Sequence, residues 1–205
     1  IRVRALLTRM DRVLGYTAGN ALEIAEAADF LTMRRVSRDL EELTMGLGSA
    51  MLVLAGRARD EDDAFGILER HWREGDAWDL FIEMVRRQGG DPESVRRTSR
   101  LPRAGRVVEV AASRGGIFSG IDARPAGEWI TDAGGGRTEA GQKVDPRVGL
   151  EILPEIGDRI EVGEPVLRLH LPHGDHEDLP ALGARAAAWI RVGEPELPRI
   201  TEILG

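Results

Sequence analysis

The segment LGYTAGNALEIAEA, residues 14–27, joins a loop with two glycines to a helix that begins at a polar residue. Gly15 and Gly19 give the loop backbone its conformational freedom, and Asn20 is placed to cap the first helical turn. Glu23 follows three residues later, where a capping-box acid belongs. Loops of this kind hold ions or phosphates at the start of the helix. The segment therefore predicts a binding site near residue 20.

A second acid in this helix extends the argument from a helix cap to a cation. If the carboxylate of Glu26 turns back toward the backbone carbonyls of Leu14 and Thr17, three oxygens converge. A hard monovalent or divalent cation requires such a set of oxygens. We therefore take these three residues as candidate metal ligands.

The composition limits the class of protein. The chain has 205 residues, of which 42% are hydrophobic, enough for one large domain or two small ones with an ordinary core. Its 28 basic and 35 acidic side chains give a formal net charge of −7, which disfavours a polyanionic partner. The longest apolar runs fall far short of the ~20 residues of a membrane span. We expect a soluble protein that binds neither nucleic acid nor membrane.

Cysteine usage and the first residues concern the compartment and the origin of the chain. No cysteine is present, which excludes disulfides and thiolate metal sites and makes the reducing cytoplasm the expected compartment. No basic and then apolar leader opens the chain, and its first residue is Ile1 rather than methionine. A processed, split or truncated product is therefore expected.

The first domain, residues 1–100, has the pattern of a strand followed by helices. Residues 1–7 alternate and then run apolar, which suits a strand buried on both faces of a parallel sheet. Helical periodicity follows from residue 20 to about residue 98, with an acidic helix start at 60–63 and a glycine stop at Gly75. Since the partners of the strand must lie elsewhere, this domain is predicted to continue a truncated α/β domain.

A second module, residues 101–205, follows a linker that contains proline and glycine. Short apolar runs separated by glycines predict strands at residues 107–110, 117–118 and 129–130. Residues 179–190 have the pattern of one further helix.

The most regular part of this module is IGDRIEVGEPVLRLHL, residues 156–171. Gly157 and Gly163 are placed at turns, and apolar residues alternate along the strand that follows. The pattern G-D-x-I-x-x-G-E-P-V resembles the strand pair of biotinyl and lipoyl carrier domains. A carrier presents a modifiable lysine at a hairpin tip, whereas the only lysine, Lys143, lies outside the pair. We therefore do not expect a swinging-arm carrier.

Two glycine-rich stretches and a histidine cluster are further candidates for ligand binding. Residues 114–120 and 134–137 combine glycine with arginine but match no phosphate-loop template, so both are interpreted as turns. The cluster has the donor types of a transition-metal site, but Pro172 and Gly174 break any helix there, and a solvated loop is expected. It consists of His170, His173, Asp175, His176 and Asp178.

His71 and a run of arginines are interpreted as structural. His71 lies beside Trp72 in a helix, and because no serine or cysteine nucleophile motif accompanies it, a partly buried packing role is expected. Five arginines near the linker are interpreted as a solvated hinge surface, the alternative being an anion-binding patch. They are Arg96, Arg97, Arg100, Arg103 and Arg106.

Several motifs occur in an order typical of one enzyme family. They are ALLTRMDRVLGYTAGNALEIAEAADFL (residues 5–31), DLEEL (39–43), MVRRQGGDP (84–92), GGGR (134–137), VDPRVG (144–149) and IGDRIEVGEPVLRLH (156–170). Their combination resembles the C-terminal half of a pyrimidine-nucleoside phosphorylase, the family that includes thymidine phosphorylase. The resemblance runs from residue 1 to about residue 170.

This resemblance implies a homodimeric pentosyltransferase that acts on a pyrimidine nucleoside and phosphate. Phosphate attacks the anomeric carbon of the sugar, the pyrimidine leaves, and a sugar 1-phosphate results. The family's Lys-His-Ser-Thr-Gly-Gly phosphate loop is absent from these 205 residues. We therefore assign no catalytic residue and no organic cofactor, and we expect the chain alone to be inactive.

The resemblance also narrows the ion site to potassium. The family's ligands correspond here to the backbone carbonyls of Leu14 and Thr17 and to the carboxylate of Glu26, and its other ligands come from the absent phosphate loop. Thr17 replaces a common alanine, which matters little for a carbonyl ligand, and Arg9 stands where the family usually has an acid. Glu23 is then a capping acid only.

The fold class implied is α+β, with residues 1–100 continuing a truncated α/β domain. Residues 101–205 would form an α/β-hammerhead related to the biotinyl-type barrel. Two other functions stay open. One is a non-catalytic assembly module that pairs with a separate N-terminal phosphorylase half, and the other is a nucleoside-monophosphate phosphorylase of the same superfamily.

Overall fold

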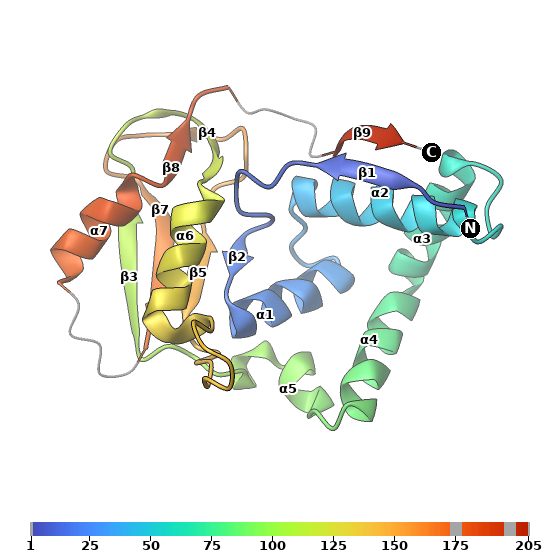
Figure 1. Cartoon of the computed structure of the whole chain (residues 1–205), viewed down its shortest axis with the longest axis horizontal. Helices are drawn as coiled ribbons and strands as arrows, with labels where there is room; N and C mark the ends of the chain where they lie inside the picture. The colour runs from blue at the N-terminus through green and yellow to red at the C-terminus, as the bar shows by residue number, and fades with distance from the viewer. Residues whose placement is uncertain (1, 173–177, 195–199, 205) are drawn as a thin grey trace. The chain divides into compact units, whose positions relative to one another are not determined.

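The computed structural model describes residues 2–172, 178–194 and 200–204, and it contains both helices and sheets (Figure 1). The elements up to residue 100 are β1 (Ala5–Thr8), β2 (Thr17–Ala18), α1 (Asn20–Leu31), α2 (Arg38–Leu54), α3 (Glu61–Glu74), α4 (Asp76–Arg87), α5 (Pro92–Arg96) and the 3-10 helix η1 (Thr98–Arg100). The later elements are β3 (Arg106–Ala111), β4 (Gly116–Ile121), α6 (Ala123–Ile130), the π-helical turn η2 (Thr131–Gly135), β5 (Gly149–Ile152), β6 (Arg159–Ile160), β7 (Pro165–Leu171), α7 (Leu179–Ala187), β8 (Ile190–Val192) and β9 (Ile200–Leu204). This mixture confirms the α+β class.

The elements group into two compact units. The first unit contains β1, the end of α1, the elements from α2 to η1, and β9. The second contains residues 10–26 and the elements from β3 to β8. The grouping crosses the division at residue 100 that the sequence suggests, because residues 10–26 join the later elements and β9 joins the earlier ones.

Capping residues set both ends of α3. The Asp60 carboxylate accepts a hydrogen bond from the backbone N–H of Asp63 at 2.9 Å and so satisfies one of the free donors of the first turn. Gly75 ends the helix in the left-handed conformation with φ +86°. The acidic start and the glycine stop predicted for this helix are confirmed.

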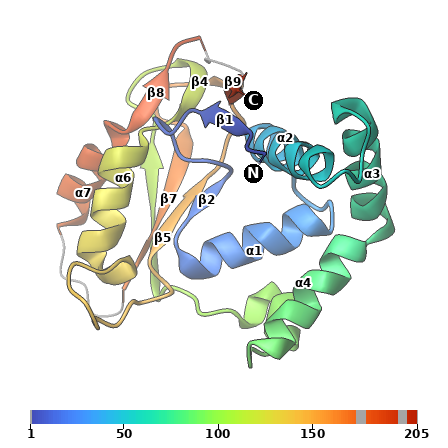
Figure 2. The same ribbon diagram turned by 45° about the vertical axis from the view of Figure 1, so that its right-hand side comes forward.

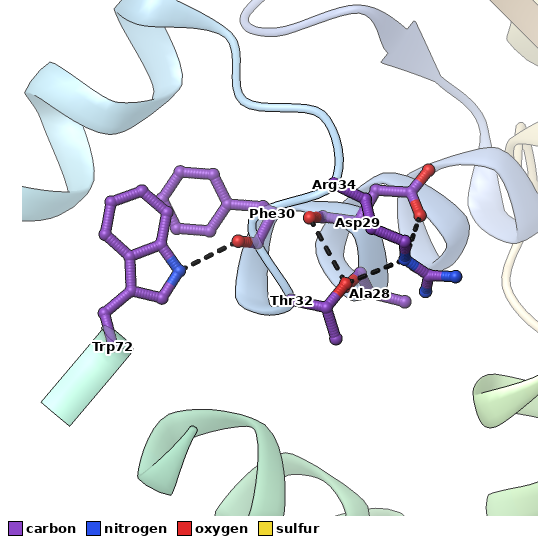
Figure 3. Close-up of polar contacts among 6 residues, drawn as sticks. All are labelled: Ala28, Asp29, Phe30, Thr32, Arg34 and Trp72. Carbon is purple, nitrogen blue, oxygen red and sulfur yellow. Dashed lines mark hydrogen bonds and ion pairs between the residues drawn. The ribbon is translucent and has the colours of Figure 1, made fainter. Parts of the chain in front are cut away.

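The C-terminal end of α1 is closed without a glycine. Met33 adopts φ +56°, its N–H donates to the Phe30 carbonyl at 3.0 Å, and the Arg34 N–H donates to the Asp29 carbonyl at 2.8 Å. These two bonds make a Schellman motif. Figure 3 shows the side chains of Thr32 and Arg34 over this end, where the Arg34 Nε–H donates to the Thr32 hydroxyl at 2.9 Å.

Trp72 of α3 anchors the same helix end. Its indole N–H donates to the Phe30 carbonyl at 2.8 Å, and the two rings stack with centroids 4.7 Å apart (Figure 3). Both residues belong to a buried cluster that also contains Met45 of α2. The core of the first unit therefore joins α1, α2 and α3.

The strand β1 differs from the one predicted. The sequence suggests a strand buried on both faces of a parallel sheet, but β1 pairs antiparallel with β9. Its side chains alternate between exposed and half-buried, and that of Leu7 is 47% exposed. The prediction is wrong because the pairing strand comes from the other end of the chain, which the apolar pattern of residues 1–7 does not reveal.

The second unit is built on two antiparallel sheets. One has the strand order β2-β5-β7-β3 and the other the order β6-β4-β8. In the central strand β7, Leu167, Leu169 and Leu171 are fully buried, while Arg168 and His170 alternate with them on the opposite face. Residues of α6 and α7 complete the buried cluster, and the two helices lie side by side next to β3 and β7 (Figures 1 and 2).

Two predictions for this unit have opposite outcomes. The strand expected at residues 129–130 is wrong, because these residues end α6, where Trp129 is 5% exposed and packs in the core one turn after Ala126. A two-residue apolar run does not distinguish a strand from the buried face of a helix. The helix expected at residues 179–190 is confirmed as α7, and Trp189, just after it, lies with its ring centroid 6.1 Å from that of Trp129.

Glycine turns separate the short strands, as predicted. Gly157 has φ +99° and Gly163 has φ +85°, a conformation that glycine adopts without a steric cost. The Gly163 N–H also donates to the Ala112 carbonyl at 2.9 Å, which ties this turn to the end of β3.

Helix length and hydropathy bear on the question of a membrane span. Within the described ranges, none of the helices is both long enough and apolar enough to cross a bilayer.

Candidate cation site

The loop predicted to hold an ion lies between a β-bridge and α1, inside the second unit. The bridge joins Arg12 to Asp122, and in β2 Thr17 lies opposite Glu151 of β5. Between these two pairings the chain turns at Gly15, which has φ +73°. The loop is therefore held at both of its ends by residues of the later module.

Glu26 reaches back from α1 onto this loop. Its Oε1 accepts a hydrogen bond from the backbone N–H of Tyr16 at 2.6 Å. Its Oε2 accepts from the N–H of Thr17 at 3.1 Å and from the Thr17 hydroxyl at 2.5 Å. A Cβ atom added to Gly15 would collide with the Glu26 carboxylate, which therefore lies directly against Gly15. The positive φ favours glycine at this position, and a larger residue there would displace the Glu26 carboxylate from the loop.

These groups have the chemistry of a site for a hard cation. The structure brings Thr17 and Glu26 into contact and places Leu14 next to the glycine that the carboxylate covers. A carboxylate oxygen carries two lone pairs, so it can accept a hydrogen bond and ligate a cation together. Carboxylate and carbonyl oxygens are the ligands that hard cations prefer. The observed contacts of Glu26 are with N–H groups and a hydroxyl rather than with the carbonyls of Leu14 and Thr17, and ligation of a cation by Leu14, Thr17 and Glu26 stays a prediction.

The start of α1 is capped by Gly19 rather than by Asn20. The Glu23 Oε1 accepts from the Gly19 N–H at 2.9 Å, and the Glu23 N–H donates to the Gly19 carbonyl at 2.9 Å. Asn20 is the first helical residue, and its side-chain amide donates to the Gly135 carbonyl at 3.1 Å. The capping role predicted for Glu23 is confirmed, and the role predicted for Asn20 is wrong.

Charged side chains extend across the sheet from Thr17. Glu151 lies opposite Thr17, Arg168 lies opposite Glu151, and Glu109 lies opposite Arg168. The Arg168 Nε donates to Glu109 at 3.0 Å, and this hydrogen bond raises the pKa of Arg168 above its ordinary value. Burial lowers the pKa of His170 on the same strand, which favours its neutral form. The sheet face beside the loop therefore carries a row of paired charges.

The other candidates from the sequence have their own hydrogen-bond partners or face solvent. His71 is exposed, with its Nδ1 2.6 Å from Asp76 Oδ2, so the partly buried packing role predicted for it is wrong. The arginines near the linker are exposed, as predicted. The loop after η2 is closed by its own hydrogen bonds, since Arg137 Nε donates to the Gln142 carbonyl at 3.1 Å and Gln142 Oε1 accepts from the Thr138 N–H at 2.8 Å.

The histidine cluster is only partly described. His170 lies in β7, and Asp178 caps α7 by accepting the N–H of Ala181 at 3.3 Å. The three remaining members, at residues 173, 175 and 176, lie outside the described residues.

Two residues at the loop were not predicted. The hydroxyl of Tyr16 donates to the carboxylate of Glu155, 139 residues later in the chain. Neither residue lies in a local pattern that suggests this contact, since their proximity depends on the pairing of β2 with β5.

Comparison with known proteins supports the motif analysis. Residues 117–191 match the model of the pyrimidine nucleoside phosphorylase C-terminal domain. The chain is 39% identical over 194 residues to a thymidine phosphorylase of Burkholderia orbicola (strain MC0-3), covering 94% of this chain and 43% of that protein. It is 34% identical over 201 residues to a pyrimidine-nucleoside phosphorylase of Bacillus subtilis (strain 168), covering 98% of this chain and 46% of that protein. The chain spans less than half the length of these curated relatives, and it belongs to the family of pyrimidine-nucleoside and thymidine phosphorylases.

Proposed function

We propose that this chain is the C-terminal portion of a pyrimidine-nucleoside (thymidine) phosphorylase. The whole enzyme cleaves a pyrimidine nucleoside with phosphate and releases the free base and a ribose or deoxyribose 1-phosphate. The observation that carries the proposal is the 34–39% identity with phosphorylases, which extends over 94–98% of the chain. The similarity is therefore not confined to one of the two units.

In this proposal the chain supplies scaffold and part of a cation site rather than the reacting groups. Phosphorolysis passes through a sugar cation between two anions, so it requires positive charge and hydrogen-bond donors around phosphate and base. The phosphate-loop motif Lys-His-Ser-Thr-Gly-Gly does not occur in the 205 residues. Nucleoside and phosphate are accordingly bound by residues outside this chain.

We expect the isolated chain to release no base from thymidine or uridine in the presence of phosphate. The product of the complete gene should release the base in a phosphate-dependent reaction. Chromatography of the base and the sugar 1-phosphate measures this release. Omission of phosphate is the control. Turnover by the isolated chain would contradict its inactivity, and a complete product that accepts only nucleoside monophosphates would contradict the substrate class.

Within the same function, the loop at residues 14–17 and Glu26 hold a monovalent cation, potassium. The support is the negative charge of Glu26 at the glycine turn and its contacts with the loop backbone. A bound cation would fix the loop at the junction of β2 and α1. Potassium is thus a structural ion here, and no organic cofactor is proposed.

The cation proposal predicts a potassium-dependent melting temperature for the product of the complete gene, which would supply the remaining ligands of the site. A ligand that binds only the folded state stabilises it, so potassium at ten times its dissociation constant should raise the melting temperature by about 4 °C over choline chloride at equal ionic strength. Glu26→Gln removes the charge with little change of shape and should abolish this shift. Glu23→Gln, one turn earlier, should melt lower but keep the shift. An unchanged potassium response in Glu26→Gln would exclude this site.

The finer architecture and the setting of the enzyme are also proposals. Residues 101–205 would form an α/β-hammerhead module, and residues 1–100 would continue the larger α/β domain. The antiparallel strands and glycine turns of the second unit support the first assignment. The family resemblance supports a homodimer in the cytoplasm.

A further inference from the structure

Tyr16, the one tyrosine of the chain, connects the cation loop to three structural elements. Its backbone N–H donates to Glu26 of α1 at 2.6 Å. Its backbone carbonyl accepts from the N–H of Ile152, the last residue of β5, at 2.6 Å. Its hydroxyl donates to the carboxylate of Glu155 in the turn after β5. The orientation of the N–H that meets Glu26 is therefore fixed from two other points.

Glu155 is itself held in a closed turn. Its N–H donates to the Asp158 carboxylate at 2.8 Å, and the Asp158 N–H donates back to the Glu155 carbonyl at 3.1 Å. The same turn is tied to buried Phe118 of β4, whose N–H donates to the Asp158 carbonyl at 2.8 Å and whose carbonyl accepts from the Gly157 N–H at 2.9 Å. The Glu155 carboxylate therefore stands on a segment that is bonded to the core.

The contact between the phenol and the carboxylate is a hydrogen bond to a strong acceptor. Both side chains are half-buried, which strengthens such a bond relative to a pair at the surface. Without it, Tyr16 would keep its backbone bonds but lose the restraint on its side chain. The β5–β6 turn can therefore control a loop to which it is not adjacent in sequence.

We infer that Glu155 is a positioning residue for the cation loop and acts through the hydroxyl of Tyr16. The inference rests on the cation site proposed above, since ligation requires the Glu26 carboxylate and the backbone of Leu14 and Thr17 to keep one mutual geometry. Within the part of the chain that the structure describes, the hydrogen bonds of Glu155 reach Tyr16 and Asp158 rather than the proposed ligands. It fixes Tyr16, which lies between Leu14 and Thr17 in the loop.

Two variants of the product of the complete gene, Glu155→Gln and Tyr16→Phe, test this inference. The backbone N–H groups of residues 16 and 17 donate hydrogen bonds to Glu26, and their hydrogen exchange is measured by NMR. Exchange should be about fivefold faster in both variants, because the hydrogen bond between the side chains of residues 16 and 155 is lost. The potassium concentration that gives half of the melting-temperature shift should rise by a similar factor. Glu161→Gln is the matched control, because it removes a carboxylate from the next turn, where its partner is the exposed Arg159.

The outcomes separate the inference from the cation proposal. Suppose that potassium stabilises the wild type and that Glu155→Gln needs the same potassium concentration for half of the melting-temperature shift. The positioning role is then wrong, and the cation site stands. If the wild type does not respond to potassium, the cation site is wrong, and the exchange rates alone decide the role of Glu155. Faster exchange at both amides in both variants, but not in Glu161→Gln, supports the role, and unchanged exchange overturns it.

Discussion

Replacing Gly19 with alanine lowers the free energy of unfolding of the second unit by about 3 kcal/mol, on two counts that add. Gly19 has φ +125°, a backbone conformation in which a Cβ atom is strained. That Cβ would also meet the carbonyl oxygen of Val148 and lie 2.7 Å from the Cα of Gly149. Both neighbours are backbone atoms at the start of β5, so neither can rotate away, and α1 and β5 must separate.

The measurement is urea unfolding together with hydrogen exchange of β5 amides, which report the second unit directly. Gly127→Ala is the matched control, because Gly127 lies inside α6 of the same unit with no atom within 4 Å of its added Cβ. In a helix interior that change should stabilise by about 0.5–1 kcal/mol. Equal effects of the two variants would show that the close approach of Gly19 to β5 does not matter to stability.

The predictable part of this fold is the part that local chemistry determines. Asp60 and Gly75 bound α3 as expected, because a side-chain acceptor at the first turn and a left-handed glycine at the last act within a few residues. The end of α1 also uses a residue with positive φ, but Met33 stands there in place of glycine, so composition carries no signal for it. The strand expected at residues 129–130 became part of α6, because the core decides between helix and strand for so short a run.

The candidate site divides in the same way. Glu23 and Glu26 could be chosen from the sequence because both lie within ten residues of the glycine loop that they contact. Helix spacing already suggests that Glu23 caps the helix and that Glu26 reaches the loop. The family resemblance leaves Glu23 with the capping role alone, and the hydrogen bonds of Glu23 agree with it. Tyr16 and Glu155 meet only because β2 pairs with β5, and a register over such a separation is not readable from spacing.

The second large effect is expected for Leu169→Ala, which should lower the free energy of unfolding of the second unit by about 3 kcal/mol. Leu169 is fully buried at the centre of β7, where it lies opposite Val108 of β3 and Leu150 of β5. Truncation removes its contacts and leaves a cavity between strands that are paired on both sides and cannot collapse without breaking register. Val162→Ala is the control, since Val162 is 70% exposed and should change stability by no more than about 0.5 kcal/mol.

Potassium binding should distinguish Leu169→Ala from Gly19→Ala although both lower stability. Leu169 faces the core, on the side of β7 opposite to Arg168, which pairs with Glu151 beside Thr17. In Leu169→Ala molecules that remain folded, the potassium concentration that gives half of the melting-temperature shift (the potassium midpoint) should stay near that of the wild type. Gly19→Ala displaces α1 from β5 and thus moves Glu26 relative to the loop, so its midpoint should rise several-fold. If Leu169→Ala shifts the midpoint as strongly, the cation response measures global stability and not the geometry at Glu26.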